Sequence, residues 1–303
     1  MSVYNSEHFV RKAIDSILNQ SYPDFEFIIV DDASTDQTSS ILRTYQDPRI
    51  IILRNRTNRG LTVSLNAAIK VSKGQYLARQ DGDDISNINR LDRQVSYMDA
   101  HNNVAVLGTT TEWIDSEDNV YYIWNQPTDH PFLQQTLFAY CCLVHGSVMC
   151  RSDVIKANQG YDTKLRTAQD YDLWLRVSEA SDIACLPDVL YYYRRHNDMS
   201  SIQSKEEQDR NANKALKNAI CRRDYYARQV LLSNRGALPL TISLMSRKKL
   251  AQRFVWWSSG ARWVSKWLAL RFFLYALMLD PTTPEIWELL RNYVSNKKDK
   301  LYK

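Results

Sequence analysis

Residues 25–36 read Phe-Glu-Phe-Ile-Ile-Val-Asp-Asp-Ala-Ser-Thr-Asp, and this stretch decides which kind of fold the chain can adopt. The run from Phe25 to Val30 is short and almost entirely apolar, which is typical of a strand buried on both faces of a parallel sheet. Asp31 and Asp32 follow the run directly. We therefore predict a buried strand that delivers two carboxylates to one edge of a sheet.

The segments on either side of this strand alternate between helix and strand patterns. Apolar residues at helical spacing predict a helix before Pro23, and the pattern recurs after residue 36 and over residues 61–69. Short apolar runs at residues 50–53 and 75–79 predict two further strands. This alternation indicates βαβ units in an open parallel sheet with helices on both faces, where ligands bind beyond the carboxyl ends of the strands.

A second acidic cluster, Asp81-Gly82-Asp83-Asp84, follows the predicted strand 75–79 at the same edge. Carboxylates two residues apart can point to a common side and hold a hard divalent cation. The chain has only 8 Gly and contains neither a G-x-G-x-x-G fingerprint nor a P-loop, so a bound diphosphate would need such a cation. The alternative interpretation is an ordinary solvated acidic turn.

Charge and composition separate the chain into two regions. Residues 1–204 contain 19 Lys/Arg and 26 Asp/Glu, whereas residues 205–303 contain 20 and 8, so the net charges are −7 and +12. The first region carries the alternating pattern. The second is helical, polar and basic, and it includes an aromatic-rich stretch at residues 254–279. We predict one domain at residues 1–203 and a basic helical region at residues 204–303.

Three features of the sequence bear on where the protein works. Its five cysteines lack C-x-x-C spacing, which argues against a disulfide framework and a structural zinc site. The first residues lack the basic and apolar regions of a secretory signal, and no run of about 18 uncharged apolar residues would span a membrane. We therefore expect a cytoplasmic protein with reduced thiols.

Several short motifs form a combination that is more specific than any one of them. They are Ser2-Val3-Tyr4-Asn5, residues 16–23, residues 30–36, Asn58-Arg59-Gly60, Leu65-Asn66, Gly74-Gln75-Tyr76, residues 81–84, Gly160-Tyr161-Asp162 and residues 169–176. Together they resemble the family-2 glycosyltransferases with the GT-A fold, over about residues 1–200. The fold implied is α/β, a Rossmann-like open mixed sheet flanked by helices, with a C-terminal helical region after it.

The resemblance implies an inverting enzyme of the hexosyltransferase type. It would move one sugar from a nucleotide-diphosphate sugar, expected to be a UDP-sugar, to a glycan or lipid-linked acceptor in cell-surface polysaccharide or glycolipid synthesis. A metal would neutralise the departing diphosphate, and a carboxylate would take the acceptor's proton. The residues implied are Tyr4, Asp31, Asp32, Asp81, Arg194 and His196 for the nucleotide, Asp83 and Asp81 for Mg²⁺ or Mn²⁺, and Asp170 as the catalytic base.

The chain departs from the family's pattern at two places. The base motif usually reads Glu-Asp, and here it reads Gln169-Asp170. Ser259 stands where the Gln-x-x-Arg-Trp signature of processive synthases would begin, so we expect an enzyme that makes single additions.

Other interpretations stay open at this point. Asp170 would serve equally as an N-cap of the helix that follows it. A sugar nucleotidyltransferase also uses carboxylate-held metal, although residues 1–20 lack its glycine-rich loop. A non-catalytic descendant that only binds nucleotide sugar is favoured by Gln169.

The stretch from Phe254 to Leu279 has two interpretations. The first is the packed core of a helical subdomain. The second is an interfacial surface whose Arg and Lys side chains reach an anionic membrane, at the inner face of the plasma membrane. We expect no nucleic-acid partner, because no recognised binding motif accompanies the +12 charge of residues 205–303.

The start of the chain also departs from the pattern it resembles. In that family an apolar strand precedes the tyrosine-asparagine motif, so Met1 takes the place of an internal methionine. Three or four buried apolar side chains of such a strand contribute about 5–10 kcal/mol, comparable with the whole stability of a typical domain. We expect a chain that starts at Met1 to lack most of its first strand and to be either truncated or marginally stable.

Overall fold

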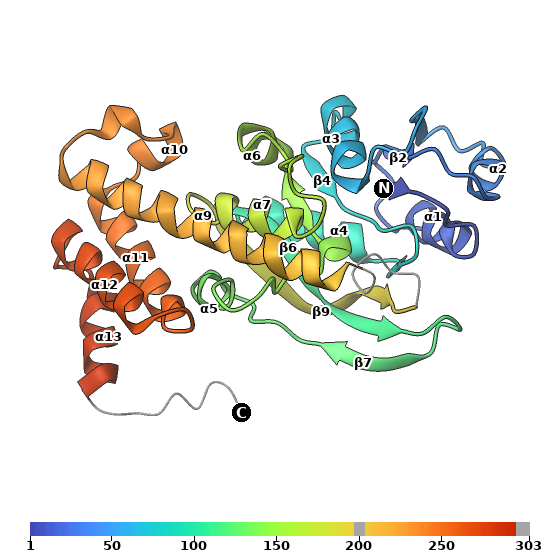
Figure 1. The fold of residues 1–303 in the computed structure, drawn as a ribbon. Coiled ribbons are helices and arrows are strands. Elements are labelled where there is room, and N and C mark those ends of the chain that lie inside the picture. The colour runs from blue at the N-terminus through green and yellow to red at the C-terminus, as the bar shows by residue number, and fades with distance from the viewer. Residues whose placement is uncertain (197–203, 295–303) are drawn as a thin grey trace. The chain divides into compact units, whose positions relative to one another are not determined.

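The computed structural model describes residues 1–196 and 204–294, which form two compact units. The two units are residues 1–130 with 141–215, and residues 131–140 with the described residues from 216 onward. The long helix α9 (Lys205–Leu231) begins in the first unit and ends in the second (Figure 1). The predicted boundary after residue 203 touches a segment outside the described residues, so the domain limits 1–203 and 204–303 stay a prediction.

The first unit contains two sheets and the helices beside them. Its strands are β1 (Ser2–Val3), β2 (Phe27–Asp31), β3 (Ile50–Arg54), β4 (Tyr76–Ala78), β5 (Ile85–Ser86), β6 (Val104–Ile114), β7 (Val120–Trp124), β8 (Met149–Arg151) and β9 (Asp182–Arg194). Its helices are α1 (Val10–Leu18), α2 (Thr38–Leu42), α3 (Leu61–Val71), α4 (Arg90–Ala100), α6 (Ser152–Ala157) and α7 (Gln169–Val177), with a 3₁₀ turn at His145–Ser147. The alternation of helices and strands predicted for the first 79 residues is confirmed.

The first sheet has the order β1–β2–β3, and all its strands are parallel. Helix α1 packs on this sheet because Val10, Ile14 and Ile17 recur at helical spacing and share one buried cluster with Phe27 and Ile29 of β2. Each buried side chain of this kind contributes roughly 1.5–3 kcal/mol. The apolar run that precedes Asp31 is therefore anchored, and this anchoring fixes where β2 delivers its acids.

The second sheet is mixed and has the order β4–β8–β6–β9–β5, with β7 paired to β6. Strands β6 and β9 are parallel, whereas β8 is antiparallel to both of its neighbours. Figure 1 shows the β6–β7 hairpin extending beside β9. A mixed sheet is what the resemblance implied, whereas the parallel sheet predicted from the alternation is wrong for β4, which lies in this second sheet and pairs antiparallel with β8. The second sheet positions the site because β5, which follows the second acidic cluster, pairs with Tyr191 and Tyr192 of β9.

Strand β1 contains only two residues, and a large cavity lies at its start. The cavity has a volume of about 650 Å³ and is lined by Met1, by Phe27 and Ile28 of β2, and by the residues of β4. The buried amino nitrogen of Met1 donates a hydrogen bond to the Ile28 carbonyl at 2.8 Å. Burial lowers the pKa of this amino group to about 4, and the positive charge of Arg79 acts in the same direction.

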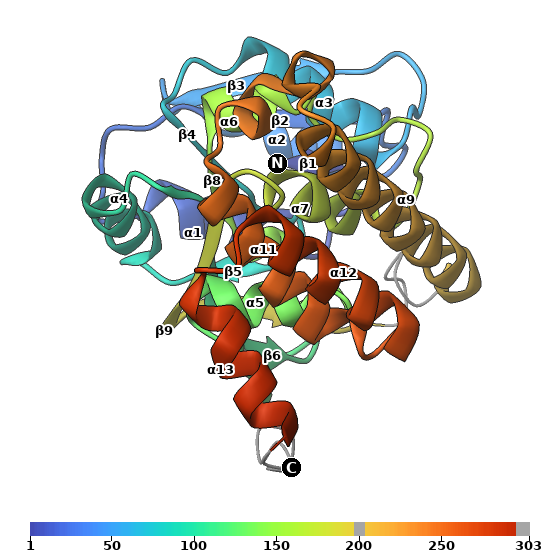
Figure 2. The same cartoon turned by 90° about the vertical axis from the view of Figure 1, so that its left-hand side faces the viewer.

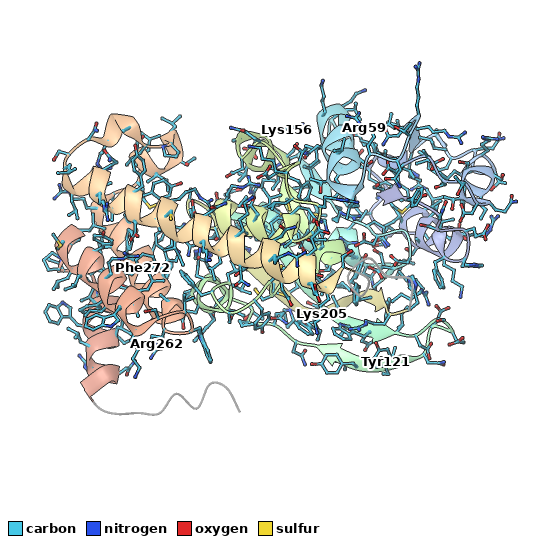
Figure 3. The ribbon with its side chains drawn as sticks, viewed as in Figure 1. Arg59, Tyr121, Lys156, Lys205, Arg262 and Phe272 are labelled. Carbon is cyan, nitrogen blue, oxygen red and sulfur yellow. The ribbon has the colours of Figure 1, made fainter. Side chains whose placement is uncertain are left out.

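The second unit is helical. It contains most of α5 (His130–Thr136), a 3₁₀ turn at Arg235–Ala237, α10 (Leu240–Ser243), α11 (Arg247–Ala261), α12 (Lys266–Leu279) and α13 (Pro284–Val294). Phe254 and Trp257 of α11 are buried against Phe272 of α12, and the two helices lie side by side (Figures 2 and 3). The packed-core interpretation of residues 254–279 is confirmed for these side chains. In the described part of the chain, no helix combines the length and the apolar character needed to cross a membrane.

We expect an N-terminal extension of five or six apolar residues to raise the melting temperature of the 303-residue chain by about 5 °C or more. The added side chains would fill the cavity, and a peptide bond would replace the buried amino group. Thermal unfolding followed by circular dichroism measures the effect. An extension of equal length made of Gly and Ser is the control, and an unchanged melting temperature with the apolar extension would contradict the expectation.

Candidate active site

Asp31 ends β2 and is connected to the loop that carries Tyr4. Its buried carboxylate accepts hydrogen bonds from the Ser34 backbone nitrogen at 2.9 Å and from the Ser39 hydroxyl. The Ser34 hydroxyl in turn accepts a hydrogen bond from the backbone nitrogen of Asn5 at 3.1 Å. The side chain of Tyr4, the residue before Asn5, is 47% exposed. Asp31 therefore shapes the edge from which Tyr4 projects.

Asp32 holds a second loop at the same edge. Its buried carboxylate accepts hydrogen bonds from Asn55 Nδ2 at 2.6 Å, from the Arg59 backbone nitrogen at 2.9 Å and from the Gly60 backbone nitrogen at 2.8 Å. Gly60 has φ of 85°, a conformation that glycine adopts without strain. The exposed side chain of Arg59, labelled in Figure 3, is thereby carried to this edge.

The two acids were predicted to contact the nucleotide directly. In the structure their carboxylates are engaged by the protein's own donors, so their visible role is to organise loops. Direct contact with a nucleotide stays a prediction for Asp31 and Asp32. Arg59 belongs to a quoted motif but was not predicted as a site residue, and it is a further candidate.

The second acidic cluster, Asp81 to Asp84, connects β4 to β5. Ser2 of β1 forms a parallel bridge with Asp81, so both acidic segments flank β1. The side chains of Asp81 and Asp83 are 27% and 29% exposed, whereas Asp84 is buried. The two D-x-D acids are thus both partly exposed on one loop.

Asp81 is paired with a buried arginine. The Arg79 guanidinium donates a hydrogen bond to Asp81 Oδ1. Burial of Asp81 opposes its ionisation, but the charge of Arg79 lowers the pKa of the carboxyl below its ordinary value. Asp81 is therefore an ionised group whose charge the protein itself balances.

Asp84 attaches the loop to β9. The Tyr191 hydroxyl donates to Asp84 Oδ2 at 2.7 Å, and the Arg194 backbone nitrogen donates to Oδ1 at 2.7 Å. Burial, reinforced by the charges of Asp83 and Asp81, raises the pKa of Asp84 well above its ordinary value. Nothing in the run Asp-Gly-Asp-Asp distinguishes its last acid, so no role is predicted for Asp84 from the sequence.

Arg194, predicted to contact the diphosphate, is buried at the end of β9. Its Nε donates to the Asp83 carbonyl at 2.7 Å, one terminal nitrogen donates to the Asp115 carbonyl at 2.6 Å, and the other lies 2.5 Å from Asp118 Oδ1. The pairing of β9 with β6 directs Arg194 to these partners. In this structure Arg194 holds the backbone of the acidic loop through the Asp83 carbonyl. Its predicted contact with the diphosphate stays a prediction.

His196 lies beside the predicted metal ligand. Its Nε2 is 3.0 Å from Asp83 Oδ2, and its ring lies against Phe9 with 5.0 Å between the ring centroids. The structure therefore places His196 where a group bound at Asp83 would meet it. Its predicted contact with the diphosphate stays a prediction.

Asp170 is the second residue of α7. The N-cap of this helix is Ala168, which has φ of 55°, so the alternative role of Asp170 as the N-cap is wrong. Asp170 Oδ2 lies 3.8 Å from the Cys141 sulfur, which donates a weak hydrogen bond to it. Next to it, the buried side-chain oxygen of Gln169 has no hydrogen-bond partner among the described residues.

His145 begins the 3₁₀ turn that contains Gly146, a position close to Asp81. Its Nε2 is 2.8 Å from the Tyr161 hydroxyl. Burial lowers the pKa of His145 to about 4, and the charges of Arg79, Asp170 and Asp81 also act on it. The lowered pKa favours the neutral imidazole of His145 at neutral pH.

The acids fit a cation that is shared with a ligand. Among residues 1–196 and 204–294, no three His, Cys, Asp or Glu side chains form a metal-binding group. Mg²⁺ commonly uses one or two protein carboxylates together with substrate phosphates and water. Asp83, with Asp81 beside it, offers that number of carboxylates, so the residues suit a cation that arrives with a diphosphate.

The fold is that of a GT-A glycosyltransferase. The structure of S. aureus TarS (residues 1–349) in complex with UDP-GlcNAc matches it with a TM-score of 0.63 at 18% sequence identity, over 99% of this chain and 91% of that chain. Residues 1–156 match the family described as Glycosyl transferase family 2. The chain therefore belongs to glycosyltransferase family 2, and this membership argues against a sugar nucleotidyltransferase.

Two relatives of known sequence support the same assignment. EpsE of Bacillus subtilis (strain 168), which carries a provisional glycosyltransferase name, is 37% identical over 205 residues, or 65% of this chain and 72% of EpsE. The O-antigen biosynthesis glycosyltransferase WbnJ of Escherichia coli is 33% identical over 203 residues, or 65% of this chain and 78% of WbnJ. Both matches span most of the relative's length.

Replacing Gly146 with alanine should disrupt this site. The added methyl group would lie 2.0 Å from the Tyr191 hydroxyl and 2.8 Å from Asp81 Oδ2, so the group that holds Asp84 must move. We expect the free energy of unfolding to fall by about 1–3 kcal/mol and UDP affinity to fall with it. Urea unfolding and calorimetric titration measure both. Gly236→Ala, whose methyl group meets nothing within 4 Å, is the matched control, and equal behaviour of the two variants would contradict the prediction.

Proposed function

We propose that the enzyme transfers one hexosyl group from a nucleotide-diphosphate sugar to a hydroxyl of a glycan or lipid-linked acceptor, with inversion of configuration. In our proposal the donor is a UDP-sugar, and the product belongs to a cell-surface polysaccharide or glycolipid. The O-antigen role in the name of WbnJ and the UDP-GlcNAc in the TarS complex support this choice. The proposal rests chiefly on one observation, that the carboxylates of Asp81 and Asp83 are both partly exposed on one loop beside β1, where His196 Nε2 lies 3.0 Å from Asp83 Oδ2.

We assign the nucleotide to the edge formed by Tyr4 and by the loops that Asp31 and Asp32 hold. The exposed ring of Tyr4 offers a flat apolar face for the base. The cation of Arg59 and the His196 ring beside Asp83 are suited to the anionic part of the donor.

The proposed cofactor is Mg²⁺ or Mn²⁺, with Asp83 as the direct ligand and Asp81 nearby. When bound, the cation would neutralise the charge that develops on the departing diphosphate. Arg79 already balances Asp81, and the raised pKa of Asp84 favours its neutral form. These two facts leave Asp83 as the carboxylate best suited to coordination.

The proposed base is Asp170. Its carboxylate takes the proton of the acceptor hydroxyl as the acceptor oxygen attacks the anomeric carbon, and the bond between that carbon and the diphosphate oxygen breaks. Attack on the face opposite the leaving group inverts the configuration, so no sugar becomes attached to the enzyme. The buried oxygen of Gln169 is available to accept a second hydrogen bond from the acceptor.

We also propose that the enzyme works at the inner face of the plasma membrane. The described residues of the second unit contain 13 Lys/Arg and four Asp/Glu, a net charge of +9. Basic residues near an anionic leaflet each contribute about 1 kcal/mol to attraction. This charge supports contact between the second unit and such a membrane.

Asp83→Asn should abolish transfer and weaken UDP binding in the presence of Mn²⁺, while the binding of uridine persists. The reason is that the variant loses the protein ligand of the cation. The diphosphate of UDP binds that cation, whereas uridine has no phosphate and does not depend on it. Calorimetric titration with and without Mn²⁺ measures this, and Asp153→Asn at an exposed position of α6 is the control. Full activity in EDTA, or an Asp83→Asn enzyme of normal rate, would overturn the assignment.

Asp170→Asn should lower kcat about a hundredfold or more and leave donor affinity nearly unchanged, as expected for the loss of a general base. Steady-state kinetics and titration with UDP-sugar measure the two quantities. Slow hydrolysis of the donor by the unaltered enzyme, without acceptor, would separate it from a non-catalytic descendant. A collapse of donor affinity in Asp170→Asn would instead assign Asp170 to binding or to structure.

A further inference from the structure

Helix α12 is apolar over most of its circumference. In the sequence from 266 to 279, Lys266 and Arg271 are the only charged residues. One side of the helix packs inside the second unit, where Phe272 is buried against Phe254 with 5.5 Å between the ring centroids. A helix that is apolar on nearly every side is normally buried on nearly every side. α12 does not follow this rule.

The opposite side of α12 is exposed. We define the α12 stripe as Trp263, Trp267, Leu270, Leu274 and Met278, all of which are exposed. These residues are three or four positions apart, so the stripe forms one row along the helix and the turn before it. Trp267 is 80% exposed and Met278 is 61% exposed. A contiguous apolar row of this kind marks a docking surface.

Basic residues stand at both ends of the stripe. Arg262 and Lys266 lie at the turn that precedes α12, and residues 247–249, Arg-Lys-Lys, open α11. The two helices are antiparallel neighbours, since the Ser258 hydroxyl donates to the Ala269 carbonyl at 2.8 Å while the earlier Phe254 lies against the later Phe272 (Figure 2). The start of α11 therefore lies near the end of α12, and cations bracket the apolar row.

The charge of the second unit decides which partner fits this surface. Two copies of a unit with a net charge of +9 would repel each other when brought face to face. An anionic lipid surface attracts the same cations and also accepts apolar side chains. Tryptophan and long basic side chains are the groups that settle at the boundary between headgroups and acyl chains.

We propose that the α12 stripe and its flanking cations dock the enzyme on an anionic bilayer, with α12 lying in the plane of the interface. The 14 residues of α12 span about 21 Å at 1.5 Å per residue, less than the roughly 30 Å of a hydrocarbon core, so the helix lies on the membrane. The stripe enters the boundary region while Arg262, Lys266 and residues 247–249 contact headgroups. This inference gives a surface to the membrane contact in the proposed function and rests on it.

The test uses the full chain and vesicles of phosphatidylcholine with or without phosphatidylglycerol. The apolar variant is Trp267→Ser with Leu274→Ser, and the charge variant is Lys248→Gln with Lys249→Gln. The control is Tyr121→Ser, which removes an exposed aromatic ring from β7 of the other unit. Melting curves check that each variant stays folded.

We expect the unaltered chain and the control to sediment with anionic vesicles. The apolar variant should lose at least about tenfold in partition coefficient, and the charge variant about fivefold for each lysine removed. High salt should reproduce the charge effect. Trp fluorescence should shift to shorter wavelength on binding, and the shift should be smaller in the apolar variant.

Two results would overturn the inference. One is equal binding of all variants to anionic vesicles, or binding to neutral vesicles that salt leaves unchanged. The other is sedimentation velocity showing a dimer that the apolar variant converts to monomer, which would assign the stripe to a second copy. UDP binding and donor hydrolysis without vesicles should be the same in every variant, so failure of the docking surface is distinguishable from failure of the proposed catalytic function.

Discussion

The buried carboxyl group of Asp84 connects the acidic loop to strand β9 of the first unit. It receives a hydrogen bond from the Tyr191 hydroxyl and another from the Arg194 backbone nitrogen, both 2.7 Å long. The same Tyr191 oxygen accepts a hydrogen bond from the Asp81 backbone nitrogen at 3.2 Å. The loop that carries the three acids is therefore fixed to β9 by these hydrogen bonds, and the geometry of its D-x-D acids depends on that strand.

This attachment also explains how three carboxyl groups can lie so close together within the four residues 81–84. Like charges so close together raise one another's pKa, and burial adds to the effect at Asp84. Asp81 avoids this cost through the charge of Arg79, and Asp83 stays at the surface beside His196. Each acid is thus given a different environment, and only Asp83 combines exposure with a position free of an arginine partner in the contacts described. The proposal that Asp83 binds the cation follows from this division.

The sequence predicted the elements whose pattern is local and missed the roles that depend on distant contacts. The apolar run at residues 27–30 and the spacing of α1 were sufficient to predict β2, its helix and the acids after it. Asp84 could not be singled out, because its partners Tyr191 and Arg194 are 107 and 110 residues away. The burial of Arg194 could not be predicted for the same reason, since only the register of β6 against β9 directs its side chain inward. Residues 131–140 likewise give no local sign that they join the second unit.

The opposite charges of the two regions give the proposed docking surface a physical consequence. Residues 1–204 carry −7 and residues 205–303 carry +12, so an anionic leaflet repels the region that holds the carboxylates and attracts the other. A single basic patch on a neutral protein would permit many orientations, because only attraction would act. Here attraction and repulsion act on different regions of the same chain, and each falls off within a Debye length of the surface. In the proposed docking mode, the acidic region is therefore disfavoured as the contacting face.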